Sequence, residues 1–518
     1  MDLFIKLSML FVFFAMTIGI GLYCRRHATD VNGFVLGGRS VGPWLTAFAY
    51  GTSYFSAVVF VGYAGQFGWK FGIASTWAGI GNSLIGSLMA WAFLGRRTRV
   101  MTQHLSSATM PQFFSARFKS PALKTASSAI IFIFLIPYTA SLYNGLSRLF
   151  GMAFDIDYSV CVIVMAILTG IYVIAGGYMA TAINDFVQGI IMIVGIIAVI
   201  GTVLKGQGGF MEAMHKLGQV SDPSVSQTPG VFASFFGPDP LGLLGVVLLT
   251  SLGTWGLPQM VQKFYAIKSE QAISKGLVIS TVFAGIVAGG CYFLGGFGRL
   301  FSDRVDVAAQ GYDAIIPAML SDLSPLLISV VVILVLSASM STLSSLVLTS
   351  SSTLTLDFIK GSIVKDMDEK KQLLIMRMLI VVFIAISVVL AIVQYASNVT
   401  FIAQLMGVSW GALAGAFLAP FLYGLYWRGA TVLSVWVSFI FSTVVMLSNI
   451  FVKSSFPAIL QSPINAGAFC MLAGLVLVPV VSLVTPKPDK AHLDRIFSCY
   501  EKKVTVTVRD SIGDSSDN

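Results

Sequence analysis

The segment Trp44–Gly65 reads WLTAFAYGTSYFSAVVFVGYAG, an apolar stretch with small and polar residues at its centre. About 20 apolar residues span the hydrocarbon core of a bilayer, so this segment is predicted to cross it. Its centre, Gly51–Ser56, is where the helix is expected to break. A second segment, Leu241–Met260, has a similar interruption at Gly253–Gln259, which includes Pro258. Proline removes a backbone donor and bends a helix, and paired interrupted spans of this kind indicate a binding site between inverted repeats.

The composition of the whole chain also predicts a membrane protein. Of its 518 residues, 56% are hydrophobic and only 11% are charged. A water-soluble core needs less apolar surface, whereas lipid-facing side chains must also be apolar. We predict an all-α integral membrane protein with about 13 transmembrane helices. The five cysteines and four histidines are scattered, and no catalytic constellation is found, so the chain is not expected to be an enzyme.

The distribution of Lys and Arg predicts the orientation, because these residues are retained on the cytoplasmic side. With the N-terminus outside, 24 of the 32 Lys and Arg fall in cytoplasmic segments and 8 in outer segments. We therefore expect a multi-pass protein of the cell membrane, plasma or inner, with a cytoplasmic C-terminus. This bias explains the net charge of +9 without a nucleic-acid partner. The polar tail, residues 485–518, is predicted to be disordered and cytoplasmic.

Two features place oxygen ligands within the predicted spans. The ninth span contains Ser337–Ser345, SASMSTLSS, whose paired hydroxyls lie one helical turn apart. Hard cations such as Na⁺ prefer oxygen ligands, although small residues at this spacing also serve close helix packing. Asp185 lies at the entry to the sixth span, where an acid is expensive unless it faces a cavity, a partner or a cation. The alternative role for Asp185 is a favourable charge at a helix N-terminus.

Three motifs together resemble the sodium:solute symporter family. They are Leu36–Ser40 (LGGRS), Gly176–Ala180 (GGYMA) followed by Asn184–Gln188 (NDFVQ), and Ser339–Ser345 (SMSTLSS). The resemblance covers most of the hydrophobic region and implies the leucine-transporter fold, built from two five-helix inverted repeats. It implies one transmembrane domain, residues 1–484, with core repeats at about 44–204 and 241–425.

The resemblance also implies ligands. A primary sodium site would use backbone oxygens of Thr52, Phe55 and Ala338 and hydroxyls of Ser341 and Thr342. Some members have a second sodium site, which matches Asp185, Ser341, Ser344 and Ser345. Family members bind solute between the two broken helices, which implies the set Tyr54, Ser56, Asn82, Thr254, Trp255 and Gln259.

The expected function is sodium-coupled symport of a small organic solute into the cell by alternating access, by a transporter that works as a monomer. Proline symporters carry an acid where this chain has Tyr54 and a Tyr where it has Thr254, whereas Gly256–Gln259 and Gly295–Arg299 look closer to the pantothenate branch. Both a carboxylate such as pantothenate and an amino acid such as proline therefore stay open. No Lys or Arg is expected in the middle of the bundle. The alternatives are a proton-coupled symporter and a membrane sensor that binds solute without moving it.

Overall fold

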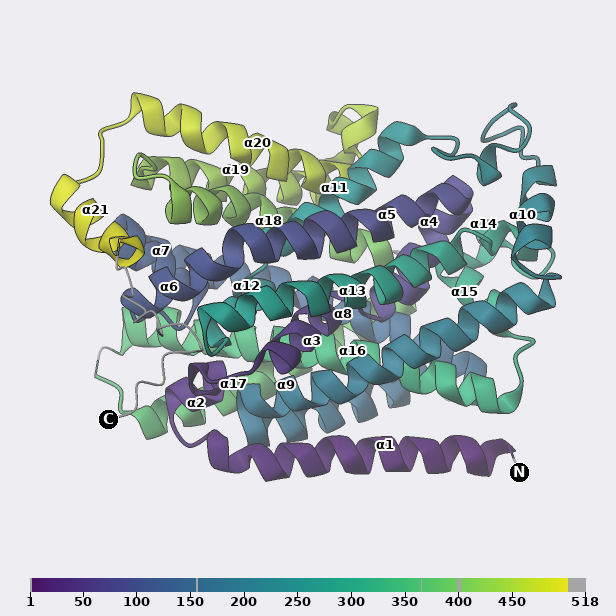
Figure 1. Cartoon of the computed structure of the whole chain (residues 1–518), viewed down its shortest axis with the longest axis horizontal. Coiled ribbons are helices and arrows are strands. Elements are labelled where there is room, and N and C mark those ends of the chain that lie inside the picture. The colour runs from purple at the N-terminus through teal and green to yellow at the C-terminus, as the bar shows by residue number, and fades with distance from the viewer. Residues whose placement is uncertain (1, 155–156, 365, 398–401, 502–518) are drawn as a thin grey trace, which may run out of the picture.

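The computed structural model describes residues 2–154, 157–364, 366–397 and 402–501, and these are helical with no β-strand among them. The helices run roughly along one direction, with the N-terminus and the C-terminal segment at opposite ends of the bundle (Figure 1). The bounds of the long helices are α1 Asp2–Cys24, α8 Pro121–Phe154, α9 Tyr158–Gly206, α13 Glu270–Gly295, α16 Pro325–Thr353, α17 Glu369–Ser397, α18 Ile402–Tyr426, α19 Val432–Phe451 and α20 Pro463–Val484.

The shorter helices form the broken spans and the two ends of the bundle. They are α2 Val31–Leu36, α3 Pro43–Tyr54, α4 Ala64–Phe71, α5 Thr76–Gly81, α6 Arg96–His104, α7 Met110–Phe118, α10 Phe210–Gln219, α11 Pro240–Gly256, α12 Pro258–Ala266, α14 Val307–Gln310, α15 Ile315–Leu320 and α21 Lys490–Phe497. Two π-helical segments matter for the site, η3 Val58–Tyr63 and η5 Asn82–Met89.

Ten helical stretches in the described residues are long and apolar enough to cross a membrane, and the bent pair α11 and α12 makes an eleventh. Two of the ten, Val58–His104 and Tyr158–Gly206, have 47 and 49 residues, which is enough for two crossings each. Each is interrupted at a glycine with positive φ, Gly72 and Gly177. The thirteen predicted spans are thus compatible with these helices.

Gly177 is the sharpest of these interruptions. Its φ and ψ are 54° and −145°, a conformation that only glycine adopts readily. A Cβ atom at this position would lie 2.7 Å from the carbonyl oxygen of Phe34. Gly201, farther along the same helix, has nothing within 4 Å of such a Cβ. The break at Gly177 is therefore both conformationally and sterically specific to glycine.

The predicted interruptions of the second and seventh spans are confirmed, and they share one geometry. Helix α3 is followed by Phe55, with φ −82° and ψ 120°, and α11 is followed by Leu257, with φ −78° and ψ 123°. Each break therefore begins with an extended residue directly after the helix. The second break bends the helix axis by 45°. Breaks of the same backbone conformation at corresponding positions fit two inverted repeats.

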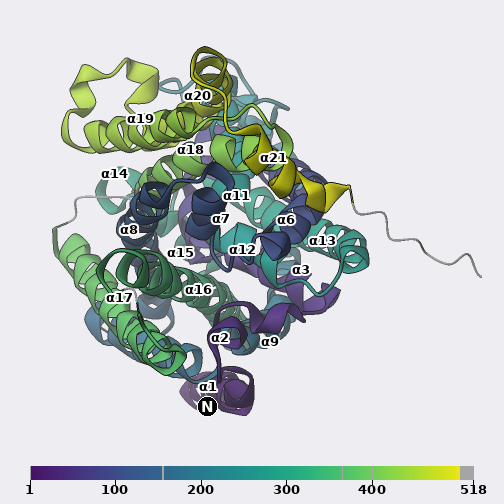
Figure 2. The same ribbon diagram turned by 90° about the vertical axis from the view of Figure 1, so that its left-hand side faces the viewer.

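The layering follows from burial. In α18, 94% of the membrane-length window is buried, and in α16 the share is 78%, whereas in α1 it is 22%. Helix α16 packs on α8, α9 and α3 in the interior. Seen end-on, α1 lies at one edge of the bundle and α19 with α20 at the other (Figure 2). The two broken spans thus meet the two most buried helices.

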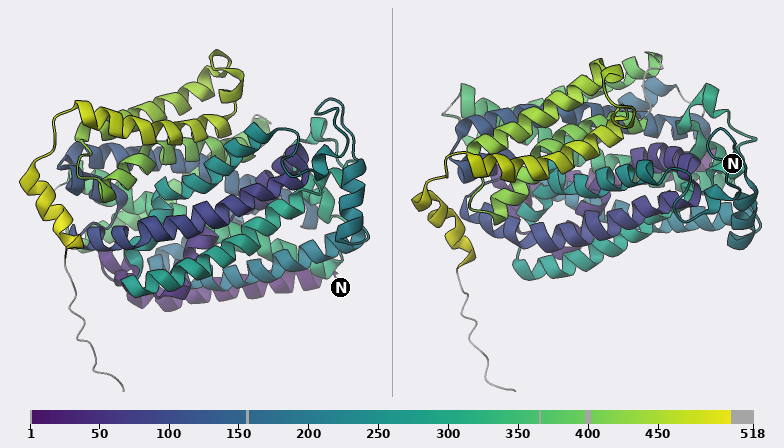
Figure 3. Two further views of the ribbon diagram at one scale, coloured as in Figure 1. Left: turned by 45° about the horizontal axis from the view of Figure 1, so that its top comes forward. Right: turned by 90° about the horizontal axis from the view of Figure 1, so that it is seen from above.

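The tail begins differently from the prediction. Residues 490–497 form α21, whose Leu493, Ile496 and Phe497 are buried. The hydroxyl of Tyr500 donates to the carbonyl oxygen of Arg97 at 3.2 Å, which ties the segment to α6. Two further views show α21 at the end of the bundle opposite the N-terminus (Figure 3). The prediction of disorder is therefore wrong for this part, and residues 502–518 lie outside the described residues.

Candidate functional site

The break in α3 faces two hydroxyls of α16. The Oγ of Ser341 lies 3.2 Å from the carbonyl oxygen of Thr52. The Oγ1 of Thr342 lies 3.1 Å from the same oxygen and 3.2 Å from the carbonyl oxygen of Phe55. Both hydroxyls also lie 3.1 Å from the carbonyl oxygen of Ala338. All five oxygens predicted for a primary sodium site therefore converge.

This cluster has more acceptors than protons. A hydroxyl carries one proton, yet the Oγ1 of Thr342 has three carbonyl oxygens within 3.2 Å. The carbonyls of Thr52 and Phe55 are available because a broken helix leaves its last turn without backbone partners. The cluster presents five uncharged oxygens but only two hydroxyl protons. Such a set suits a hard monovalent cation, which prefers oxygen ligands.

The second predicted set is arranged differently. Asp185 is fully buried on α9, and neither of its carboxylate oxygens makes a hydrogen bond. Its Oδ2 lies 4.0 Å from the Nζ of Lys263. That Nζ donates to the Oγ of Ser345 at 3.0 Å. The Oγ of Ser344 instead donates to the backbone of Ser341 on its own helix. An ammonium group therefore stands between the acid and one of the serines.

Lys263 corrects the expectation that no Lys or Arg lies in the middle of the bundle. Lys263 follows the predicted seventh span, Leu241–Met260, so the sequence predicts that it belongs to the cytoplasmic segment after that span. The structure places it on α12, the second half of that span, with 2% of the residue exposed. The sequence gives one sign of this burial, because the segment after Pro258 continues the seventh span. The mixed polarity of Pro258–Ala266 predicts a helix with one face exposed, whereas every residue of α12 is buried.

Three of the predicted solute residues stand at the two breaks with unpartnered polar atoms. The hydroxyls of Tyr54 and Ser56 and both amide atoms of Gln259 are buried and make no hydrogen bond. Tyr54 ends α3, Ser56 follows the break, and Gln259 lies in the first turn of α12. Buried polar groups are normally hydrogen-bonded, so each such exception needs an explanation, and a bound ligand is one.

The other three predicted solute residues take part in contacts between α11 and η5. The Oγ1 of Thr254 donates to the carbonyl oxygen of Gly86, and the indole Nε1 of Trp255 donates to that of Ile85, both at 2.9 Å. The Oδ1 of Asn82 accepts from the Oγ of Ser251 at 3.2 Å, while its Nδ2 makes no hydrogen bond. Their role in solute binding remains a prediction.

Trp410 is a residue that sequence reasoning missed. It is fully buried on α18, and its ring centroid lies 5.7 Å from that of Tyr54 and 5.9 Å from that of Tyr138. A Cβ atom on Gly253, in the last turn of α11, would lie 2.6 Å from the Trp410 ring. The indole therefore connects the broken ends of both spans. The signal in the sequence was a single tryptophan, between Ser409 and Gly411, within a predicted span.

At the end of the bundle where the N-terminus lies, Arg299 holds three elements together. Its Nε donates to the carbonyl oxygen of Trp69 at 2.7 Å, and its Nη1 pairs with the Oδ2 of Asp222 at 2.9 Å. Its guanidinium also stacks 3.8 Å from the ring centroid of Phe232. Hydrogen bonds from Ser224 and Arg299 hold the pKa of Asp222 below its ordinary value.

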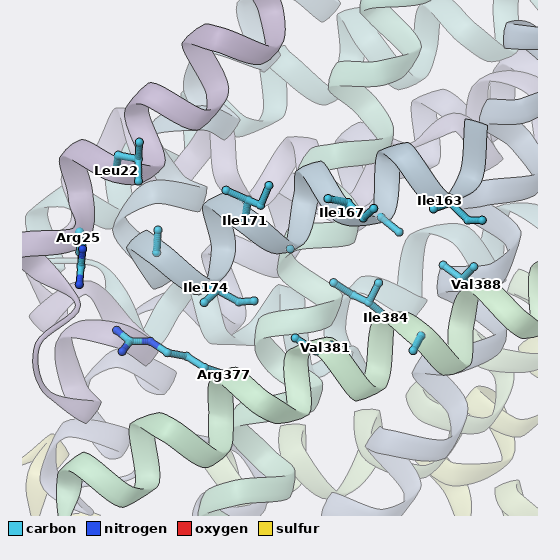
Figure 4. A pocket seen from close by; sticks show the side chains of 14 residues that line it. Leu22, Arg25, Ile163, Ile167, Ile171, Ile174, Arg377, Val381, Ile384 and Val388 are labelled. Carbon is cyan, nitrogen blue, oxygen red and sulfur yellow. The ribbon is translucent and has the colours of Figure 1, made fainter. Parts of the chain in front are cut away.

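A separate hollow lies on the outside of the bundle. It has a volume of about 690 Å³ and lies between α1, α9 and α17 (Figure 4). Its walls are mostly aliphatic, with Arg25 and Arg377 at one end. Ile163, Ile167 and Val381, which line it, are 44%, 57% and 56% exposed. It therefore belongs to the surface that meets lipid and shares no residue with the site at the helix breaks.

Comparisons of sequence place this geometry in a family. The sodium:solute symporter family profile matches residues 34–449. The osmoregulated proline transporter OpuE of Bacillus subtilis (strain 168) is 28% identical over 519 residues, covering 97% of this chain and 99% of OpuE. A sodium/proline symporter of Staphylococcus aureus (strain JH9) is 29% identical over 505 residues, covering 95% of this chain and 88% of the symporter.

A solved structure shares the fold. A Na⁺-coupled sialic acid symporter, in a substrate-bound outward-open state, matches with a TM-score of 0.71 at 15% identity, covering 94% of this chain and 99% of the other. The expected leucine-transporter fold is thereby confirmed. The chain belongs to the sodium:solute symporter family. It is a sodium-coupled symporter of a small solute, and Na⁺ is its coupling ion.

Proposed function

We propose that the symporter carries a small amino acid into the cell, with proline as the first candidate solute. Two relatives that align along almost the whole chain are named as proline transporters. Unpartnered amide atoms of Gln259 lie at the N-terminus of α12, where the helix dipole favours a carboxylate. The aromatic faces of Tyr54 and Trp410 suit a compact apolar ring. Pantothenate, which shares the carboxylate, is the competing solute.

The proposed sodium site rests on one observation, the convergence of five oxygens at the α3 break. Here Na⁺ would be held by the carbonyl oxygens of Thr52, Phe55 and Ala338 and by the hydroxyls of Ser341 and Thr342. Three of these belong to α16, one to the last turn of α3 and one to the break that follows it, so the ion would tie the broken span to the buried helix α16. Tyr54 and Ser56 flank the ligand Phe55, so ordering of the break by sodium would also order the solute residues.

We infer alternating access with the N-terminus outside and the C-terminus in the cytoplasm. The bias in Lys and Arg supports this direction, and the N-terminus and α21 lie at opposite ends of the bundle (Figure 1). Sodium would enter from outside, order the break and the solute residues, and leave where its concentration is low. All the proposed ligands come from one chain, which supports a monomer as the transporting unit.

The available free energy is sufficient for uphill transport. Moving one charge across 100 mV is worth about 2.3 kcal/mol, and a tenfold sodium gradient adds about 1.4 kcal/mol. One sodium ion therefore supplies about 3.7 kcal/mol, enough for solute accumulation of several hundred-fold, on the order of 500. The number of ions per cycle thus decides how far the solute can be concentrated.

Uptake into proteoliposomes tests the proposal. The purified chain is reconstituted, and an inward sodium gradient is compared with an equal potassium gradient for radiolabelled L-proline and pantothenate. We expect sodium-dependent uptake of L-proline, with pantothenate neither transported nor competing. The matched control is the Ser341→Ala/Thr342→Val double variant, which should lose sodium dependence while remaining folded. Sodium-driven pantothenate uptake without L-proline uptake would replace the solute, and equal uptake in potassium would refute sodium coupling at this site.

A further inference from the structure

Four helices meet at the ammonium group of Lys263. Its Nζ donates to the Oγ of Ser345 on α16 at 3.0 Å and lies 4.0 Å from the Oδ2 of Asp185 on α9. It also lies 5.1 Å from the ring centroid of Tyr178. Ser345 in turn shares a hydrogen bond of 2.8 Å with Ser53 on α3. The side chains of Lys263 and Asp185 are 3% and 0% exposed, so this is a cation built into the protein interior.

We propose that the ammonium of Lys263 occupies the position that a second sodium ion would take, so that the symporter binds and moves one Na⁺ per cycle. This rests on the proposed primary sodium site, because it counts the ions beyond that one. The acid and the serine that would ligate a second ion are both present, yet they already face a positive charge that belongs to the chain.

The ligand geometry supports one cation at this position and not two. A sodium ion between Asp185 and Ser345 would sit within a few ångströms of the Lys263 Nζ. At about 4 Å and an effective dielectric constant of about 20, two like charges repel enough to weaken binding on the order of 10³-fold. Of the remaining predicted ligands, Ser341 faces Thr52 in the primary site, and the Oγ of Ser344 donates to its own helix. The second set therefore does not fit a further sodium ion.

The chain also holds the lysine in place. The neighbouring Gln262 donates to the carbonyl oxygen of Val35 at 3.1 Å and accepts from the Oγ1 of Thr349 at 2.7 Å. These bonds fix the rotation of α12 relative to α2 and α16, and with it the direction of the Lys263 side chain. A tethered ammonium compensates Asp185 without being released inside. It therefore adds no free energy from the sodium gradient to the transport cycle.

Counting bound sodium tests the proposal without knowledge of the solute. Equilibrium binding of ²²Na⁺ to the purified full-length chain is measured per folded protein. We expect one ion for the unchanged protein and for Lys263→Arg, which keeps the charge. We expect two for Lys263→Ser, which removes the charge and adds an oxygen ligand. The double variant Lys263→Ser/Asp185→Asn should return to one, because the second ion loses its acid.

A transport measurement gives an independent count. With the membrane potential clamped at zero and a tenfold sodium gradient, one coupled ion limits the accumulation of radiolabelled L-proline to about tenfold, and two allow about a hundredfold. We expect the lower limit. Two ions bound per unchanged chain, accumulation clearly above tenfold, or a folded Lys263→Ser variant that still binds one ion would each overturn the proposal. If the Ser341→Ala/Thr342→Val variant leaves ²²Na⁺ binding unchanged, the primary sodium site, on which this proposal rests, is rejected instead.

Discussion

Thr342→Val removes one oxygen from the five at the α3 break and keeps the branched shape of the side chain. The lost hydroxyl lies 3.1 Å and 3.2 Å from the carbonyl oxygens of Thr52 and Phe55. A polar contact to a charged group contributes about 1.5–3 kcal/mol. We therefore expect the half-saturating sodium concentration to rise by about 10- to 150-fold, with little change at saturating sodium.

The assay is the sodium dependence of L-proline uptake, supported by ²²Na⁺ binding. Thr342→Ser, which keeps a hydroxyl, should recover most of the affinity. Thr353→Val is the matched control, because this buried threonine lies on the same helix and its hydroxyl donates to the backbone of Thr349 and Ser350 in that helix. An unchanged sodium affinity in folded Thr342→Val, or an equal loss in the control, would refute the reasoning.

Three further perturbations test other parts of the structure. Gly177→Ala should destabilise the protein by about 1–3 kcal/mol, seen as a lower unfolding temperature, while Gly201→Ala should be neutral or slightly stabilising. Trp410→Ala removes ring contacts worth about 0.5–1.5 kcal/mol each; in uptake kinetics the half-saturating solute concentration should rise more than that of sodium. Arg299→Ala should cost about 1–3 kcal/mol and expose the loop at 220–239 to protease. Since the pKa of Asp222 is lowered, its contact with Arg299 is complete above the ordinary Asp pKa and is lost as pH falls through the lowered value, so unchanged protease sensitivity at acid pH would contradict this role.

The broken spans were predictable because the bilayer restricts the backbone structures that a membrane-spanning segment can adopt. A membrane-length apolar segment must be helical, and polar residues at its centre have to face protein or a cation. Gly51–Ser56 and Gly253–Gln259 could therefore be assigned as breaks from their composition alone. The oxygens of Ser341 and Thr342 followed from their spacing on one helix together with the family resemblance. Their convergence on the carbonyls of Thr52 and Phe55 agrees with that prediction.

The tail was harder to predict because its signal is local and weak. Eight residues of mixed polarity, Lys490–Phe497, form no stable helix alone. They become helical where Leu493, Ile496 and Phe497 can bury their side chains. Trp410 was missed for a related reason, since a single tryptophan in an apolar span carries no sign of which helix it will contact.

The sequence by itself was enough to predict the membrane spans, the two breaks and the residue types of the proposed sodium ligands, because each depends on neighbours along one helix. Only the tertiary structure decided the position of Lys263. It lies 82 residues from Ser345 along the chain and beyond the end of the predicted seventh span, Leu241–Met260. The 45° bend after Leu257 directs α12 into the bundle, so that a charge near the end of one segment meets a buried acid from another. Such long-range pairing of charges depends on how helices cross, which no local pattern encodes.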